Sequence, residues 1–394
     1  MNGTRLTFRA LGLLLCCGTG AAGSHSSLQA QLPSWTLERN LQIGEMDGPR
    51  ALSRVADVVV DSGTGRIYIA QPTEQAIKVF DPAGRLVHAF GRRGAGPGEF
   101  QGGLGHLGFT GDSLYAVDAA NQRISMFSLA GSVHYSTRLV SPPPEARMGV
   151  PGPIGMLADG RILAKPMLSR QASLDTSFSV PLALYERDGA LRGVLTRLKE
   201  GGTQGHLRTE RGAVVFWQPL AAPPLVAVEQ HGRSVVVVTR DPRAQRDGRP
   251  VFRVQTFTAA GEVLYDRYYN YRPEPLPPTV TDSLRQSWIS DFGSRLLSAS
   301  AAVRASRELL TFPPHEPPIS AVATSTSGDV WLRREEIGKT LVEYIVLNAV
   351  GTPVARVQLP RGVIVRRIVG DEVYAVTHGE FDIPYVVRYQ IRRS

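Results

Sequence analysis

The sequence predicts an all-β fold, a six-bladed β-propeller with four-stranded blades, and two recurring glycine turns carry this prediction. At 394 residues the chain exceeds the usual size of one hydrophobic core, so we expect either two domains or units that pack on their neighbours. The first turn places a glycine just before a short apolar strand at Gly65, Gly111, Gly160, Gly232, Gly328 and Gly370. The second places a glycine four residues after a strand's last large apolar side chain, at Gly84, Gly131, Gly189, Gly261 and Gly351.

Alternation of apolar and polar residues divides each unit into four short strands. Segments such as AIKVF, RISMF and RVQTF precede the second turn, and RLVHAF follows its first copy. This period of two is typical of half-buried strands. Tight turns between paired strands require a positive φ, which glycine adopts without steric cost. Four-stranded units around an axis are propeller blades, and a closed ring leaves no long exposed sheet edge.

The second turn has five copies where the first has six, and the missing copy predicts how the ring closes. The last alternating segment, YVVRYQI, lies at the end of the chain, where that turn would begin. The segment WTLERNLQI at 35–43 alternates in the same manner and precedes the first blade. We therefore expect it to supply the outer strand of the last blade. A pair of open β-sandwiches, the alternative, explains neither the turn count nor the four-strand recurrence.

The first thirty residues have the features of a secretory signal peptide. Arg5 and Arg9 precede an apolar run at 10–17, and small residues follow it. Both cysteines, Cys16 and Cys17, lie in this region, so lipid anchoring stays an alternative to ordinary cleavage. No later stretch is apolar enough over the length needed to cross a bilayer.

We expect a signal peptide at 1–30 and one propeller domain at 31–394, exported to the periplasm or the extracellular space. Cleavage could follow Ala22 or Ala30. Without cysteines, the mature chain has no disulfide, thiol nucleophile or cysteine metal ligand.

The charge pattern favours an anionic ligand or partner. The formal net charge is +9, and removing Arg5 and Arg9 leaves +7 on the mature chain. Only four of the forty-four basic residues are lysines. Arginine suits bidentate capture of carboxylates, although scattered solvated charge is the simpler interpretation. No dense basic run of the nucleic-acid type is present.

A long insertion at 270–318, between the fourth and fifth blades, predicts helices. Proline clusters bound it, and Leu284, Trp288 and Phe292 recur at helical spacing. Ser283 and Gln286 suggest a capping box. We expect one or two helices on the propeller face, acting as a plug of the channel mouth or as a lid or docking element.

The stretch FGRRGAGPGEF at 90–100, with the blade after it, resembles the NHL repeat over residues 52–138. The matching positions are Gly96, Pro97, Gly98, Phe100, Tyr115, Asp118, Asn121, Arg123, Ile124 and Phe127. The first blade departs from the pattern at Gln71 and Glu74, and the last at Thr377. The resemblance implies membership of the NHL-like and TolB-like six-bladed propellers. In such repeats the aspartate, asparagine and arginine resemble groups that tether loops to backbone, with ligand binding as the minority interpretation.

Long loops on one face of the propeller define the candidate binding site. They span 90–103, 141–153, 199–224, 240–250 and 270–318. The predicted ligand-binding residues are Arg92, Arg93, Lys165, Arg240, Arg243, Arg333, Arg334, Asn121 and Arg123. Trp217, Tyr269 and Tyr271 could stack on a sugar or a peptide.

Three motifs that suggest a catalytic, dinucleotide-binding or metal site have simpler explanations. The GDSL at 111–114 lies in a strand turn with no matching base, and the glycines at 103, 105 and 108 lack the helix that a dinucleotide site requires. His378, Glu380 and Asp382 are weak metal candidates in a loop.

The predicted inner strands offer only Asp57, His106 and Glu229 as scattered candidates for an axial catalytic site. We therefore predict an exported, non-catalytic propeller that needs no cofactor and binds a protein, a peptide or an anionic glycan. The alternative is a metal-dependent hydrolase or lyase with its site at the propeller axis. Nucleic-acid binding conflicts with export.

Overall fold

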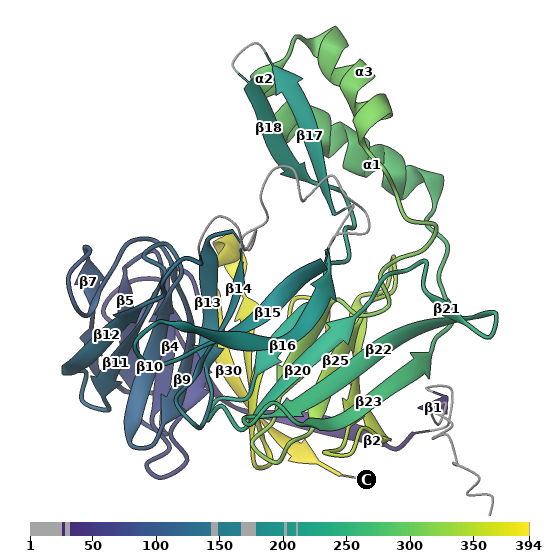
Figure 1. The fold of residues 1–394 in the computed structure, drawn as a ribbon. Coiled ribbons are helices and arrows are strands. Elements are labelled where there is room, and N and C mark those ends of the chain that lie inside the picture. The colour runs from purple at the N-terminus through teal and green to yellow at the C-terminus, as the bar shows by residue number, and fades with distance from the viewer. Residues whose placement is uncertain are drawn as a thin grey trace, which may run out of the picture.

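The computed structural model describes residues 26–27, 32–142, 149–166, 179–200, 203–209 and 212–393, so most of the predicted signal peptide lies outside the described residues. The described chain forms mainly antiparallel sheets in a propeller-like arrangement, with a small module that projects from it (Figure 1). No helix in the described ranges is long and apolar enough to cross a membrane.

Three separate sheets each contain four strands in chain order. The first comprises β3 (Val58–Val60), β4 (Ile67–Gln71), β5 (Ala76–Phe80) and β6 (Leu86–Phe90). The second comprises β9 (Leu104–Thr110), β10 (Ser113–Asp118), β11 (Arg123–Ser128) and β12 (Val133–Arg138). The third comprises β13 (Pro151–Met156), β14 (Ile162–Pro166), β15 (Ser179–Tyr185) and β16 (Leu191–Lys199). Between the first two sheets, β7 (Arg92–Arg93) pairs with β8 (Glu99–Phe100).

A fourth sheet has the same four-stranded core and two short additions. Its core strands are β19 (Leu225–Val228), β20 (Ser234–Thr239), β22 (Arg249–Thr258) and β23 (Val263–Asn270). The short strands β1 (Ser26–Ser27) and β21 (Gln245–Arg246) pair with β23 and β22.

Eight further strands form one continuous sheet, which differs from the predicted division into six separate sheets. Its order is β24 (Ala321–Thr324), β25 (Val330–Arg334), β26 (Leu341–Leu347), β27 (Pro353–Pro360), β2 (Ser34–Ile43), β30 (Pro384–Arg392), β29 (Glu372–His378) and β28 (Ile364–Val369). The two halves join through β2, whose Ser34 and Trp35 pair in parallel with Arg356 and Val357 of β27. The sequence pattern missed this junction because its turn glycines mark hairpins, and no turn connects β27 to β2.

The predicted pairing of the amino-terminal segment with the final segment is confirmed. Strand β2 runs antiparallel to β30 from Thr36, opposite Arg392, to Ile43, opposite Val386. A buried cluster continues this contact across the ring, because Ile43 and Val386 share it with Val58 and Phe80 of the first sheet. Hydrogen bonds and apolar burial therefore both join the ends of the chain.

The turn glycines behave as predicted. All eleven have a positive φ, between 57° at Gly111 and Gly370 and 94° at Gly261. Neighbouring sheets pack face to face, as in the cluster where Val59 and Tyr68 of the first sheet meet Leu107 and Phe127 of the second.

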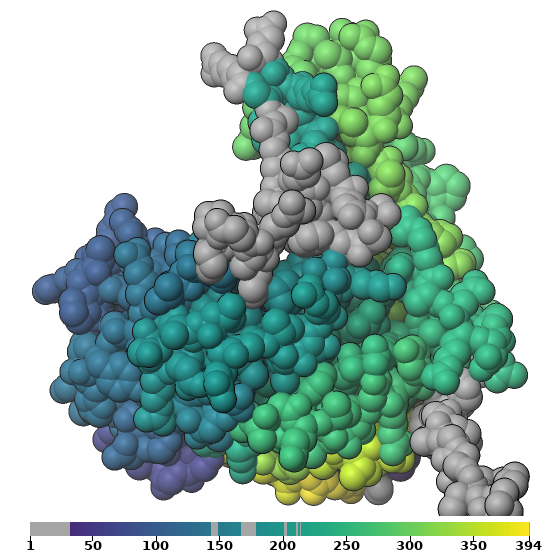
Figure 2. Space-filling view, viewed as in Figure 1, coloured from purple at the N-terminus to yellow at the C-terminus, as the bar shows by residue number. Residues whose placement is uncertain are grey.

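The helices of the long insertion do not lie flat on the propeller but pack on a hairpin that the sequence had suggested was a loop. The hairpin consists of β17 (Gln204–Thr209) and β18 (Gly212–Trp217). The helical part consists of α1 (Pro278–Trp288), the π-helical turn η3 (Ile289–Gly293), α2 (Ser294–Leu296) and α3 (Ala299–Leu309). A separate small core joins them, with Leu207 and Phe216 from the hairpin and Trp288, Ala305 and Leu310 from the insertion. We call residues 203–209, 212–218 and 278–312 the projecting module; it projects from the sheets in Figure 1 and forms the upper lobe in Figure 2.

The helix boundaries differ from the capping prediction. Helix α1 begins at Pro278, before the predicted cap at Ser283, because proline at the first helical position needs no hydrogen bond for its nitrogen. Gly293 does not interrupt the helical run, because it has helical dihedral angles at the end of η3, directly before α2. A Cβ there would lie 2.9 Å from Trp288 and 3.1 Å from Ala302, so the glycine allows the close approach of η3 and α3.

Deleting residues 32–43 should abolish cooperative unfolding, because β30 loses its partner strand and the first and last sheets lose their shared cluster. Circular dichroism during heating would measure this. A matched variant that begins at Leu32 should keep a single transition. A normal melting transition in the shorter chain would contradict the closure mechanism.

Candidate functional site

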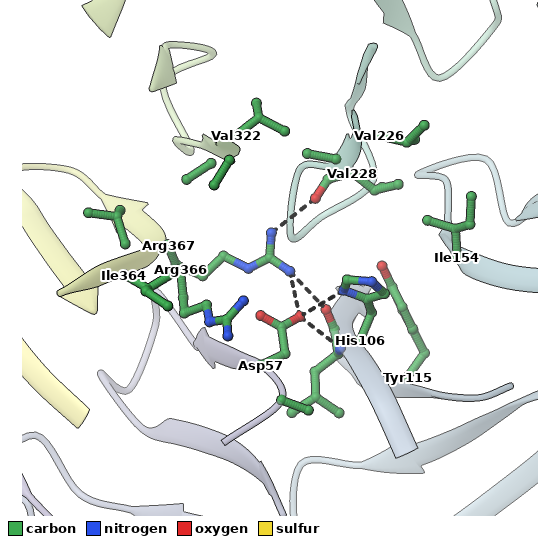
Figure 3. Close-up of a pocket in the computed structure, with 16 residues that line it drawn as sticks. Asp57, His106, Tyr115, Ile154, Val226, Val228, Val322, Ile364, Arg366 and Arg367 are labelled. Atoms are coloured by element: carbon green, nitrogen blue, oxygen red, sulfur yellow. Dashed lines mark hydrogen bonds and ion pairs between the residues drawn. The ribbon is translucent and has the colours of Figure 1, made fainter. Parts of the chain in front are cut away.

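A cavity of about 100 Å³ lies where the innermost strands meet (Figure 3). Its lining comes from β9, β10, β13, β19, β24 and β28 and from the residues just before β3. Apolar side chains including Ile154, Val226, Val322 and Ile364 form much of the wall. The polar groups are Asp57, His106, Tyr115, Arg366 and Arg367. We call this space the axial cavity.

Three of the innermost strands carry an irregularity at the residue that faces the axial cavity. On β28, Val365 pairs with Ala375 and Arg367 with Tyr374, which leaves Arg366 as an extra residue. Ile154 is extra in the same way on β13, and Gly105 and His106 together oppose a single residue on β10. A β-bulge re-aims side chains that regular alternation would point elsewhere. The bulges therefore account for His106, Ile154 and Arg366 all lining one cavity.

Asp57 and Arg367 form a buried ion pair across the axis. One Nη atom of Arg367 lies 2.8 Å from Oδ2 of Asp57, and the other donates to the carbonyl of Val228 at 3.0 Å. The backbone nitrogens of Val58 and Leu107 also donate to the Asp57 carboxylate. Burial alone would raise the pKa of Asp57, but the Arg367 guanidinium and the hydrogen bonds hold it well below its usual range. Asp57 is therefore an ionised, fully engaged structural carboxylate.

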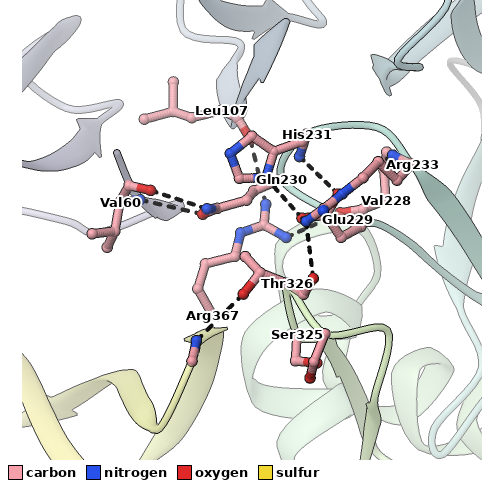
Figure 4. Close-up of polar contacts among 12 residues, drawn as sticks. Val60, Leu107, Val228, Glu229, Gln230, His231, Arg233, Ser325, Thr326 and Arg367 are labelled. Carbon is pink, nitrogen blue, oxygen red and sulfur yellow. Dashed lines mark hydrogen bonds and ion pairs between the residues drawn. The ribbon is translucent and has the colours of Figure 1, made fainter. Parts of the chain in front are cut away.

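Polar contacts bridge the axis near the turn between β19 and β20 (Figure 4). The side-chain amide of Gln230, next to β19, donates to the carbonyl of Val60 on β3 at 3.0 Å, and its oxygen accepts from the Val60 nitrogen at 3.3 Å. The carbonyl of Gln230 also accepts from the nitrogen of Phe109 at 2.6 Å. These contacts connect strands that lie on different sides of the ring.

Glu229 anchors the turn that presents Gln230. Its carboxylate contacts the Nδ1 atom of His231 at 3.0 Å and Arg233 at 3.2 Å, and Arg233 also donates to the carbonyl of Thr326. Burial opposes ionisation of Glu229, but hydrogen bonds from His231 and Arg233 outweigh it and lower its pKa from 4.5 to about 2. The predicted axial candidates Asp57, His106 and Glu229 thus do lie near the axis, two of them in ion pairs with arginine.

The axial cavity does not have the ligands of a divalent metal site. Asp57 is the only carboxylate in its lining, and Arg367 already neutralises it. Among the described residues, no three histidine, aspartate or glutamate side chains gather closely enough to hold a metal ion. This includes the weak candidates His378, Glu380 and Asp382, the last two in the short 3-10 turn η4 (Glu380–Asp382). Tyr115 is buried, which raises its pKa to about 12 and keeps the phenol neutral.

Several of the predicted ligand-binding arginines make structural contacts. Arg240 is buried and donates to the carbonyls of Pro223 and Ile319, both at 2.9 Å. Arg333 is buried beside Glu335 and donates to the carbonyl of Arg361. Arg334 donates to the carbonyl of Arg272 at 3.3 Å.

The residues of the NHL-like pattern tether the linker at 90–100, as the resemblance implied. Arg123 donates to the carbonyls of Ala95 and Glu99 and lies 3.3 Å from Asp118. Asn121 donates to the same aspartate at 2.6 Å.

The remaining predicted residues divide into paired and unpaired cations. Arg92 donates to the Glu99 carboxylate at 2.7 Å, and Lys165 to the buried Glu200 at 2.8 Å. Arg93 is exposed, and no contact joins its side chain to a described residue. Of the three aromatic candidates, Trp217 is 56% exposed, whereas Tyr269 and Tyr271 are buried and cannot stack on a ligand.

Arg243 lines a second cavity, of about 300 Å³, where the projecting module joins the sheets. We call it the module cleft. Its lining includes Lys199 at the end of β16, Gln218 at the base of the hairpin and Thr311 after α3. No ion pair joins the Lys199 or Arg243 side chain to any residue in the described part of the chain. Lys199 is absent from the predicted ligand-binding residues because the sequence pattern assigned 199–224 to a long loop, whereas Lys199 is the last residue of β16.

The sheet arrangement and the axial cavity make this chain a β-propeller protein. No family model matches the sequence, and no curated protein matches it. Among solved structures, a member of the DUF4221 family from Bacteroides vulgatus is similar, with 10% identity over 91% of this chain and 98% of that chain and a TM-score of 0.53. This likeness shows the fold alone.

Two further structures are more distant. A Bacteroides fragilis protein described as exported has 11% identity over 91% of this chain and 99% of that chain, with a TM-score of 0.48. The Cps50 propeller domain of Myceliophteria thermophila has 10% identity over 90% of this chain and 100% of that chain, with a TM-score of 0.45. None of these comparisons identifies an NHL or TolB-like family, so that resemblance stays a prediction.

Lowering the pH should remove the contribution of Glu229 to stability. Its pKa is depressed in the folded state, so its contribution is present above the unfolded value near 4.5 and is lost as the pH falls toward 2. At pH 7 we expect Glu229→Gln to lower the free energy of unfolding by about 3 kcal/mol. The difference between variant and parent in urea titrations should shrink below pH 4.5. The control is Glu262→Gln, at an exposed position; a pH-independent difference at Glu229 would contradict this role.

Replacing Arg240 should affect folding. Burial lowers the pKa of Arg240 only to about 10, so it stays charged at neutral pH. Arg240→Met leaves the carbonyls of Pro223 and Ile319 without a donor and should lower the free energy of unfolding by about 2–4 kcal/mol. The exposed neighbour Arg243→Met should change it by less than about 0.5 kcal/mol. Equal denaturation midpoints for both variants would refute the distinction.

Proposed function

We propose that this chain is an exported, non-catalytic six-bladed propeller that binds a protein, peptide or anionic glycan partner on the face that carries the projecting module. The observation that carries the proposal is the module cleft, where the side chains of Lys199 and Arg243 form no ion pair with any carboxylate among the described residues. Exposed cations in a concave site attract anionic groups and leave their hydrogen-bond donors available to them.

The blade count of six rests on how weakly the eight-stranded sheet is joined. Only two residue pairs connect β27 to β2, whereas β2 and β30 pair along most of their length. Its two halves each contain a four-stranded unit with an inner strand, β24 or β28, at the axial cavity. Counting the halves as separate blades gives six units around one axis.

The projecting module supports a binding role because it adds surface that the sheets do not need. Its core is separate from the clusters between sheets, so the ring does not depend on it for burial. Trp217, at the end of the hairpin near the cleft, is exposed and could stack on a sugar ring or a peptide group. Of the other predicted residues, Arg93 also remains available to a ligand.

The metal-dependent alternative would need several oxygen or imidazole ligands that converge on the axis. The axial cavity offers one carboxylate, and that carboxylate is paired with Arg367. Binding without catalysis is therefore the better-supported function. Export rests on the signal-peptide pattern at 1–30.

Replacing both cations of the module cleft with glutamate should strongly weaken the binding of anionic polymers. We expect the Lys199→Glu, Arg243→Glu double variant to bind poly-L-glutamate or alginate at least about tenfold more weakly than the parent, since the sign of the cleft potential inverts. Biolayer interferometry at low ionic strength would measure this.

The control is Arg197→Glu with Arg356→Glu, which changes the net charge equally on exposed outer strands. Equal losses in both double variants would show non-specific attraction. Absence of polymer binding by the parent protein would count against an anionic partner.

A further inference from the structure

We propose that the axial cavity is a binding site for a short aliphatic carboxylate, with Arg366 as the anchor of the carboxylate group. This site is independent of the module cleft and differs from it in the chemistry of its walls. It would admit a small organic acid or the acidic end of a longer ligand.

The charge balance of the cavity leaves one cation unused. Asp57 and Arg367 neutralise each other at 2.8 Å, and Arg367 is further held by the carbonyls of Val228 and Leu107. Arg366 lies beside this pair in Figure 3, and no hydrogen bond or ion pair joins its guanidinium to any described residue. Its Nε atom is also shielded from solvent. A guanidinium in this state gains most from an oxyanion that accepts two parallel hydrogen bonds.

The bulge on β28 gives Arg366 its position. It is the extra residue between Val365 and Arg367, so two successive arginines both reach the cavity, whereas regular alternation would separate them. Two other inner strands, β13 and β9, are irregular in the same way at Ile154 and His106. β-Bulges are frequent next to binding sites as well as at sheet edges, and three of them on strands that line one cavity fit a binding site there.

The walls select the ligand class. Polar and apolar groups share the lining about equally, so a phosphate or sulfate ion, which is polar on every side, would place some of its oxygens against Ile154, Val226, Val322 and Ile364. A carboxylate has one charged end for Arg366 and a hydrocarbon tail for these side chains. A volume of about 100 Å³ is the space of roughly three water molecules, which suits an acid of a few carbon atoms.

Butyrate is the test ligand, measured by isothermal titration calorimetry on the purified protein, with butyramide, butylamine and inorganic phosphate as comparisons. We expect butyrate alone to bind. Arg366→Gln should weaken it about 10- to 100-fold, which corresponds to loss of a charged hydrogen bond, and Arg366→Lys should restore part of the affinity. The matched control Arg197→Gln, an exposed arginine on β16, should bind as the parent does.

Ala321→Phe provides a second test that leaves every charge in place, because it fills the cavity from β24. It should also remove butyrate binding. The Lys199→Glu, Arg243→Glu variant should retain it, which separates this site from the proposed partner cleft. Butyrate binding that survives both Arg366→Gln and Ala321→Phe, no butyrate binding by the parent, or equal binding of phosphate would each overturn the proposal.

Discussion

The antiparallel pairing of β2 with β30 is the constraint on which the rest of the molecule depends. It joins the two ends of the chain from Thr36 to Ile43, and it brings the last sheet against the first through the cluster around Ile43 and Phe80. A ring held this way fixes the distance between inner strands that are far apart in the sequence. The ion pair between Asp57 and Arg367, separated by 310 residues, can form only because the ring is closed.

The axis shows how polar groups are tolerated inside a propeller. Buried charges are costly unless they are paired and hydrogen-bonded, and Asp57 meets both conditions with Arg367 and two backbone nitrogens. In the turn between β19 and β20, the Glu229 carboxylate accepts a hydrogen bond from Arg233, and the Gln230 side chain donates to the carbonyl of Val60 on β3. Arg366 differs from these groups, because no hydrogen bond or ion pair joins any atom of its guanidinium to a described residue. A guanidinium with all its donors unpaired, beside groups that are paired, is a stronger indication of ligand binding than any single exposed arginine on the rim.

Local signals in the sequence were sufficient for the strands and turns, because a glycine at positive φ and a period of two are decided within a few residues. The pairing of 35–43 with the chain end followed from counting turns. The hairpin at 204–217 was missed because its pattern is short, and the helices that cover Leu207 and Phe216 lie more than sixty residues later. The roles of Arg240 and Arg366 were equally inaccessible. Charge and position in the sequence do not reveal which arginine meets a backbone carbonyl and which lies on a bulge.

The projecting module has a consequence for the order in which the protein is made. Its hairpin leaves the ribosome well before α1 and α3, so Leu207 and Phe216 have no apolar cover until the whole fourth sheet has been synthesised. The nascent chain therefore exposes an apolar patch during an intermediate stage of synthesis. Slow elongation between the hairpin and the helices would prolong that stage and favour aggregation, whereas the finished protein would be unaffected.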